Sequence, residues 1–95
     1  MDIKQTPQFT VWLHSLKDFR AKQKIATRIR RLGFGHFGDT KPVGDGVSEL
    51  RIHEGKGYRV YFVQRNGVVV ILLCGGNKKT QSRDITAAKA LAKEV

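Results

Sequence analysis

Three apolar segments separated by turn residues dominate the second half of the chain. They are residues 47–53, 58–65 and 68–74, and the breaks between them contain Gly55-Lys56-Gly57 and Asn66-Gly67. Runs of β-branched and aromatic residues bounded by glycine are typical of β-strands. The third segment is apolar on both faces, which favours a central place in a sheet. The pattern therefore predicts three consecutive strands that form the framework of the protein.

The remainder of the chain predicts helices, one short strand and a loop. Phe9, Trp12, Leu13 and Leu16 follow the spacing of one helical face after Pro7, and a second helix over 19–32 begins after Asp18 as its N-cap. Residues 2–6 predict a short edge strand. Residues 33–46 contain five glycines and predict a loop. A last helix starts near Thr80, with an apolar face ending in Ala92 and Val95.

The predicted order of elements is β-α-α-β-β-β-α. With 95 residues, 40% of them hydrophobic, the chain fits one domain spanning 1–95. We expect a small α+β fold with a mainly antiparallel, twisted sheet and a helical hairpin packed on one face.

The register of the first hairpin decides which side chains share a face. A three-residue loop at Gly55-Lys56-Gly57 would place Glu54 opposite Tyr58, His53 opposite Arg59, and Arg51 opposite Tyr61. One face would then carry only core residues, namely Leu50, Ile52, Val60 and Phe62. The other would carry Arg51, His53, Arg59 and Tyr61. A one-residue slip would exchange the two faces.

Charge narrows the range of partners. The chain has 18 Lys and Arg against 8 Asp and Glu, a net charge of +10. Nucleic acid is the leading partner, because neutralising phosphates releases counterions. An acidic protein comes second and an anionic membrane surface third. The single cysteine, Cys74, and the lack of an apolar N-terminal run predict a reduced, cytoplasmic setting with no membrane association.

The available chemistry is cationic. Histidines and carboxylates are too scattered for a metal cluster, so we expect neither metal nor cofactor. The residues expected to form a cationic cleft are Arg51, His53, Arg59, Tyr61, Lys78, Lys79 and Gln81. Such a cleft can promote metal-free RNA cleavage, in which the 2′-hydroxyl attacks the adjacent phosphate and cations stabilise the added negative charge. The second helix adds Lys24, Arg28 and Arg31, which form either a solvated face or an RNA-binding surface.

Several short motifs resemble one family of small toxins. ELRI at 49–52, GYRVYF at 57–62, ILLCGGNKKTQ at 71–81 and DITAA at 84–88 are similar to the RelE/ParE superfamily. More narrowly, they resemble its HigB-like, phage-derived addiction module killer branch. The similarity covers nearly the whole chain, including LKD at 16–18 and GDTKP at 38–42.

The resemblance implies the toxin of a type II toxin–antitoxin system with a RelE-like fold. Many relatives cut mRNA on the ribosome and are inhibited by an antitoxin, in this branch often an Xre-like helix-turn-helix protein. We therefore expect ribosome and mRNA as targets, a monomer when free and a hetero-oligomer with the antitoxin. The family's strand arginine corresponds to Arg59 and its later basic residue to Lys78, with Arg51 and His53 near further basic positions.

Two features leave alternatives open. RelE uses a tyrosine near the start of its C-terminal helix, and here that place corresponds to Asp84 or a neighbour, so the acid and base are not assigned. The ParE members inhibit DNA gyrase and do not cleave RNA. The sequence thus predicts a metal-independent mRNA endonuclease, with a gyrase inhibitor lacking nuclease activity as the alternative.

Overall fold

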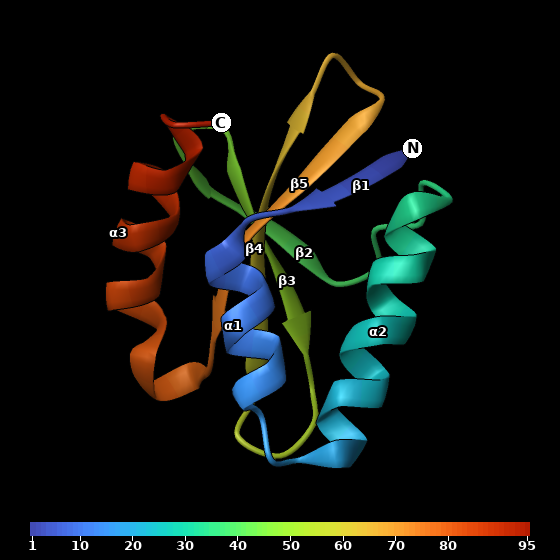
Figure 1. The fold of residues 1–95 in the computed structure, drawn as a ribbon, viewed down its shortest axis with the longest axis vertical. Coiled ribbons are helices and arrows are strands. Elements are labelled where there is room, and N and C mark those ends of the chain that lie inside the picture. Colours follow the sequence, from blue (N-terminus) through green and yellow to red (C-terminus); the bar gives the residue numbers. More distant parts are fainter.

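A twisted five-stranded sheet forms the centre of the molecule (Figure 1). The computed structural model describes all residues, 1–95. The strands are β1 (Asp2–Gln5), β2 (Thr40–Gly44), β3 (Val47–Ile52), β4 (Tyr58–Arg65) and β5 (Val69–Gly76). The helices are α1 (Pro7–Ser15), α2 (Phe19–Gly33) and α3 (Gln81–Ala92), with a 3₁₀ turn, η1 (Lys78–Thr80), before α3. The predicted α+β class is confirmed.

The strands lie in the order β1-β5-β4-β3-β2. β1 pairs in parallel with β5, and the other neighbours are antiparallel. The predicted edge position of the first strand and the central position of the third apolar segment are both confirmed. The two N-terminal helices also begin as predicted, because Thr6 and Asp18 accept hydrogen bonds from the backbone N–H groups of Phe9 and Ala21.

Residues 33–46 are not wholly a loop, as the glycine content suggested. Thr40–Gly44 form strand β2, which pairs with β3 at the edge of the sheet. This strand escapes sequence recognition because it lacks an apolar run and contains Pro42. Proline is tolerated in an edge strand, where its missing N–H faces no neighbour, and the register shifts between Pro42 and Gly44.

The β3–β4 turn is two residues longer than predicted. Ile52 lies opposite Tyr58, so the loop contains five residues, His53 to Gly57, and the three-residue turn was wrong. Arg51 is opposite Arg59, and Glu49 is opposite Tyr61. Because the error is two residues, the side chains keep their predicted faces, since alternation has a period of two.

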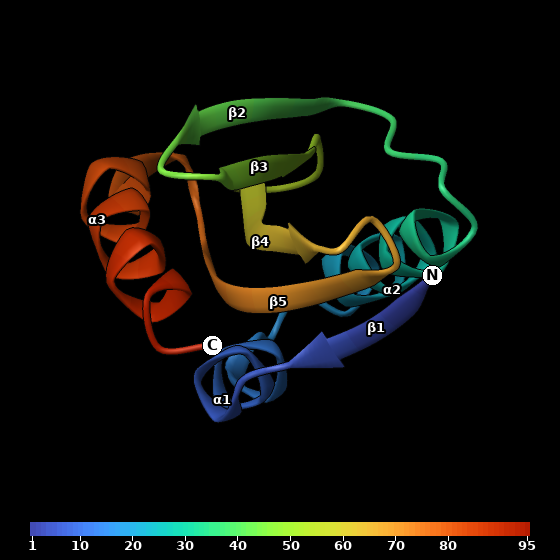
Figure 2. The same cartoon turned by 90° about the horizontal axis from the view of Figure 1, so that it is seen from above.

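Helices cover both faces of the sheet (Figure 2). On the first face, α1 and α2 pack through Phe9, Ala21, Ile25 and Leu32 against a core that contains Leu50, Ile52, Val60 and Phe62. On the second face, α3 packs through Ala88 and Ala92 against Val47, Tyr61, Val63 and Leu73. The predicted helical hairpin on one face is therefore confirmed, and α3 packs on the opposite face. None of the helices combines the length and hydrophobicity needed to cross a membrane.

Candidate functional site

Two arginines lie side by side on the α3 face, where β3 and β4 approach their connecting loop. Arg51 of β3 lies directly opposite Arg59 of β4, and Gly76 of β5 lies opposite Arg59 on the other side of β4. The three residues form one row across the sheet. A Cβ at Gly76 would collide with the carboxylate of Asp84, which is buried in the first turn of α3. The row therefore brings together the ends of three strands and the start of a helix.

A buried carboxylate lies under Arg59. Glu49 is only 1% exposed, and its Oε2 accepts hydrogen bonds from Tyr61 Oη at 3.0 Å and Gln81 Nε2 at 2.7 Å. The Nε of Arg59 lies 3.7 Å from the same oxygen, and the Arg59 side chain is 12% exposed. Its Nη1 donates to the carbonyl of Gly57 at 2.5 Å, so the guanidinium is fixed before any ligand arrives.

Lys78 lies next to this guanidinium. A Cβ built on Gly57 would be 3.2 Å from Arg59 Nη1 and 3.5 Å from Lys78 Cβ, so the Arg59 guanidinium and the start of the Lys78 side chain flank one glycine. The Lys78 amide also donates to the Lys56 carbonyl at 3.4 Å. Asn77 caps the turn by accepting from the Lys79 and Thr80 amides. Lys78 and Lys79 are both exposed. We refer to Arg59 and Lys78 as the Arg59–Lys78 pair.

Arg51 and His53 share a second carboxylate. Asp39 accepts from Arg51 Nη2 at 3.2 Å and forms a 2.5 Å contact with His53 Nε2. The hydrogen bond from His53 is the largest cause that lowers the pKa of Asp39, and Arg51 lowers it further. The His53 side chain is 75% exposed, so its ring is accessible to a ligand while one nitrogen is fixed by Asp39.

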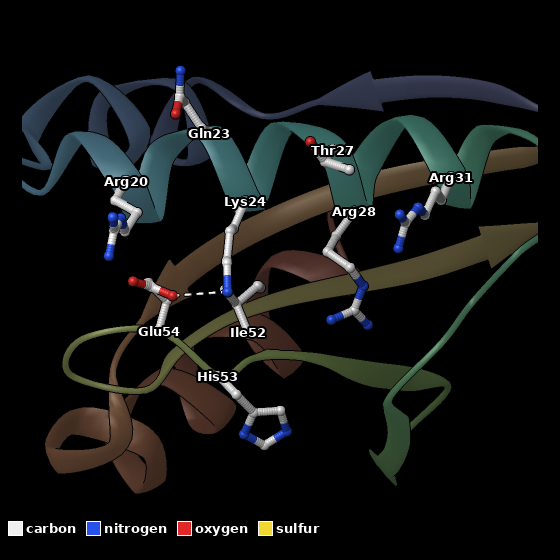
Figure 3. Close-up of a pocket in the computed structure, with 9 residues that line it drawn as sticks. All are labelled: Arg20, Gln23, Lys24, Thr27, Arg28, Arg31, Ile52, His53 and Glu54. Carbon is white, nitrogen blue, oxygen red and sulfur yellow. Dashed lines mark ion pairs between the residues drawn. The ribbon is translucent and has the colours of Figure 1, made fainter.

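A cationic groove of about 550 Å³ runs between α2 and the end of β3 (Figure 3). Four cations of α2, namely Arg20, Lys24, Arg28 and Arg31, line it together with His53. Two of the four are engaged internally. Lys24 forms a 2.8 Å ion pair with Glu54, which the figure shows spanning the groove. Arg28 donates to the carbonyls of Arg51, Phe37 and Asp39 and thereby fixes the segment that carries Asp39.

The structure separates the predicted site residues into two neighbouring groups. Glu49, which sequence reasoning did not single out, gathers Arg59, Gln81 and Tyr61, with Lys78 and Lys79 beside them. Asp39, also missed, gathers Arg51 and His53. A usable signal existed for Glu49, because it precedes Arg51 by two residues and so shares its face of the strand.

Tyr61 was expected in the cationic cleft, but it does not lie on the surface with the cations. It is 0% exposed under α3, because that helix covers most of the second face. Burial and the neighbouring Glu49 raise the pKa of Tyr61, so its hydroxyl remains a hydrogen-bond donor to Glu49. No group of three His, Cys, Asp or Glu side chains has an arrangement that could bind a metal ion.

Comparisons with known proteins agree with the fold described above. A chain of the crystal structure of the intact E. coli RelBE toxin–antitoxin complex is similar with a TM-score of 0.62 at 15% identity, covering 80% of this chain and 94% of that one. An uncharacterized protein of Haemophilus influenzae (strain ATCC 51907 / DSM 11121 / KW20 / Rd) is 60% identical over 95 residues, covering all of this chain and 96% of the relative. Residues 11–94 match the family described as Phage derived protein Gp49-like (DUF891), and the chain therefore belongs to that family.

Proposed function

We propose that the protein is the toxin of a type II toxin–antitoxin pair and acts as a ribosome-dependent, metal-independent mRNA endonuclease. Membership of the Gp49-like family and the shared fold with a chain of a toxin–antitoxin complex support the toxin role. The single observation that favours a nuclease is the Arg59–Lys78 pair, in which the Arg59 guanidinium is held by the Gly57 carbonyl, the Lys78 side chain begins beside it and Arg51 lies opposite Arg59. We further propose the HigB-like branch as its place among related toxins.

The reaction requires only groups present in this arrangement, the RNA and water. The 2′-hydroxyl loses its proton, and its oxygen bonds to the neighbouring phosphorus. The P–O5′ bond breaks, and the departing 5′-oxygen takes a proton from water, which leaves a 2′,3′-cyclic phosphate and a 5′-hydroxyl. Arg59 and Lys78 stabilise the negative charge that develops on the phosphate. Because Gly57 and Glu49 already orient Arg59, little reorganisation is needed at the moment of reaction.

His53 is the proposed proton acceptor. Asp39 fixes its Nε2, which leaves Nδ1 on an exposed ring to take the 2′-proton. The same carboxylate stabilises the imidazolium that forms. Arg51 binds the RNA backbone beside it, since Asp39 orients its guanidinium as well. In this proposal Asp39 and His53 act as a carboxylate–imidazole pair, in which the carboxylate orients the base.

Surrounding residues provide contacts to RNA. Lys79 is exposed next to the Arg59–Lys78 pair, and Arg31, with Lys24, lines the groove along α2. These positions suit the phosphates of mRNA or ribosomal RNA. Gln81 and Arg28 contribute indirectly, because the first donates to Glu49 and the second to three backbone carbonyls. The proposed inhibitor is an antitoxin with a helix-turn-helix domain, which forms a hetero-oligomer with the otherwise monomeric toxin in the cytoplasm.

The test compares Lys78→Ala with Lys93→Ala. Both residues are exposed and both changes remove one charge, but Lys93 lies at the other end of α3. After brief induction of each variant, mRNA 5′ ends are mapped and growth is recorded. Lys78→Ala should lower cleavage about 100- to 1000-fold, whereas Lys93→Ala should match the unchanged protein. Growth arrest with intact mRNA and DNA damage signalling would refute the nuclease and support the gyrase inhibitor.

A further inference from the structure

A second groove lies on the other side of the β3–β4 loop from the cationic groove of α2. It has a volume of about 550 Å³ and is bounded by the end of α1, the α1–α2 connection, the loop itself and Asn77. Figure 1 shows these segments at the same end of the sheet as the start of α3. The volume falls within the range of sites for small organic ligands, roughly 300–1,000 Å³.

The groove is lined by the same two backbone segments that carry Gly57 and Lys78, although Arg59 projects from the opposite face of the sheet. Two of its lining residues, Lys56 and Asn77, are the chain neighbours of Gly57 and Lys78. The Lys78 amide donates to the Lys56 carbonyl, so these two segments are in direct contact. A ligand whose phosphate lies between Arg59 and Lys78 therefore has this groove within reach of its next chemical group.

Aromatic side chains form one wall. Trp12 and Tyr58 both line the groove, with ring centroids 6.4 Å apart in an edge-to-face arrangement. Trp12 packs against Gly75, where any Cβ would collide with the indole ring, so its position is fixed by the sheet. Tyr58 is only 6% exposed and supports the indole from behind, so the half-buried Trp12 ring is the surface on which a planar base can stack.

A carboxylate completes the groove. Asp18 Oδ1 accepts from the Ala21 amide as the N-cap of α2, whereas Oδ2 points toward Gly55. A Cβ at Gly55 would lie 2.6 Å from Oδ2, so only a glycine lets the loop approach this oxygen so closely, and Oδ2 has no hydrogen-bond donor within the protein. A carboxylate accepts hydrogen bonds but donates none. It therefore favours a ligand edge that carries N–H groups, such as the amino group of a base.

We propose that this groove binds the base of the ribonucleotide next to the phosphate at Arg59 and Lys78, and that Asp18 selects bases with an amino group over uracil. Adenine, cytosine and guanine each offer an exocyclic amino group to Oδ2. Uracil offers only one ring N–H between two carbonyl oxygens, which the carboxylate repels. This inference rests on the proposed nuclease for its substrate, and it adds a specificity-determining residue to it.

Trp12 is the only tryptophan in the chain, so its fluorescence reports on the groove directly. The full protein is titrated with AMP, CMP, GMP, UMP and inorganic phosphate. The three amino-bearing nucleotides should quench Trp12 with affinities at least roughly tenfold higher than UMP, the value expected for one hydrogen bond to a charged group. Inorganic phosphate should bind without comparable quenching, because it carries no ring.

Asp18→Asn tests the selectivity while preserving the fold, since Asn and Asp are equally good N-caps. The amide both donates and accepts, so the preference over UMP should fall to within about twofold. The matched control is Asp45→Asn, which removes the same charge at the β2–β3 turn, at the opposite end of β3, and should keep the tenfold preference. Thermal unfolding of both variants checks that they fold.

The outcomes separate this inference from the nuclease. Quenching by inorganic phosphate equal to that by the nucleotides would overturn the base site even if mRNA is cut, and equal quenching by all four nucleotides would overturn the selection against uracil. An unchanged preference in Asp18→Asn would overturn the role of Asp18. A preference over UMP that is lost in Asp18→Asn would support the base site. It would do so even if the protein cleaves no RNA, and only the nuclease would then be refuted.

Discussion

Replacing Glu49 with glutamine removes the charge beneath Arg59 while keeping the shape and one acceptor for Tyr61. At the observed 3.7 Å separation and an effective dielectric constant of about 20, the attraction between Glu49 and Arg59 is about 4 kcal/mol. Glu49 is buried and Arg59 nearly so, which leaves the guanidinium without a counter-charge in Glu49→Gln. We expect the free energy of unfolding to fall by about 3 kcal/mol, within the range seen when one partner of a buried pair is lost.

The assay is thermal and urea unfolding followed by circular dichroism. For a domain of this size, a loss of about 3 kcal/mol lowers Tm by roughly 12–24 °C. Glu94→Gln, an exposed acid near the C-terminus, removes the same charge and should leave Tm unchanged. In Glu49→Gln with Arg59→Met, stability should recover in part, because removing both members of a buried pair is often neutral. A single variant as stable as the unchanged protein would refute the view that Glu49 compensates Arg59.

Three further predictions concern packing, acid and thiol chemistry. Gly75→Ala should destabilise the protein by about 1–3 kcal/mol, because the new methyl group collides with the Trp12 ring. Gly33→Ala in α2 makes only ordinary contacts and should not destabilise it, and urea unfolding compares the two variants. His53 and Arg51 lower the pKa of Asp39 from 3.8, so the contribution of Asp39 to stability is present above pH 3.8 and is lost as the pH falls through the folded pKa. In unfolding measured from pH 7 to pH 2, Asp39→Asn should lose less stability toward acid than the unchanged protein. Burial raises the pKa of Cys74 to about 11, so its thiol should react with iodoacetamide at pH 8 far more slowly than a free cysteine does. The stability of the unchanged protein should fall between pH 9 and 11, and that of Cys74→Ala should fall less. Equal reaction rates in native and urea-unfolded protein would contradict this.

Sequence periodicity predicted the faces of the sheet better than its contacts. Alternation alone placed Leu50 and Val60 in the core and Arg51 and Arg59 on the other face, and a register error of two residues left this division intact. The partners across the hairpin were wrong, because loop length depends on the turn geometry of 53–57 rather than on its glycines alone. Periodicity thus fixed side-chain direction and left the register open.

The environment of each site residue was harder to predict. Tyr61 is buried because α3 folds back over β4, a packing choice that no local pattern in the strand reveals. Arg28 belongs to the predicted basic set on the second helix, yet its guanidinium donates to the carbonyls of Phe37 and Asp39 in the predicted loop and to that of Arg51 in β3. Both differences arise from contacts between residues that are distant in the sequence, which composition and spacing do not encode.

The acidic residues explain how two arginines can face each other in a protein of net charge +10. Like charges directly opposite in a sheet are destabilising, and Arg51 and Arg59 are such a pair. Glu49 lies against Arg59, and Asp39 lies against Arg51. The carboxylates therefore flank the two cations and hold them in position.

This arrangement makes a prediction that opposes simple charge counting. Asp39→Asn raises the net charge by one, which by counting alone should strengthen RNA binding and cleavage. The geometry predicts lower cleavage instead, by about tenfold or more, because Arg51 and His53 lose the group that orients them. Asp45→Asn, with the same charge change in a distant turn, should cleave normally. Cleavage by Asp39→Asn that equals or exceeds that of Asp45→Asn would show that charge matters here and position does not.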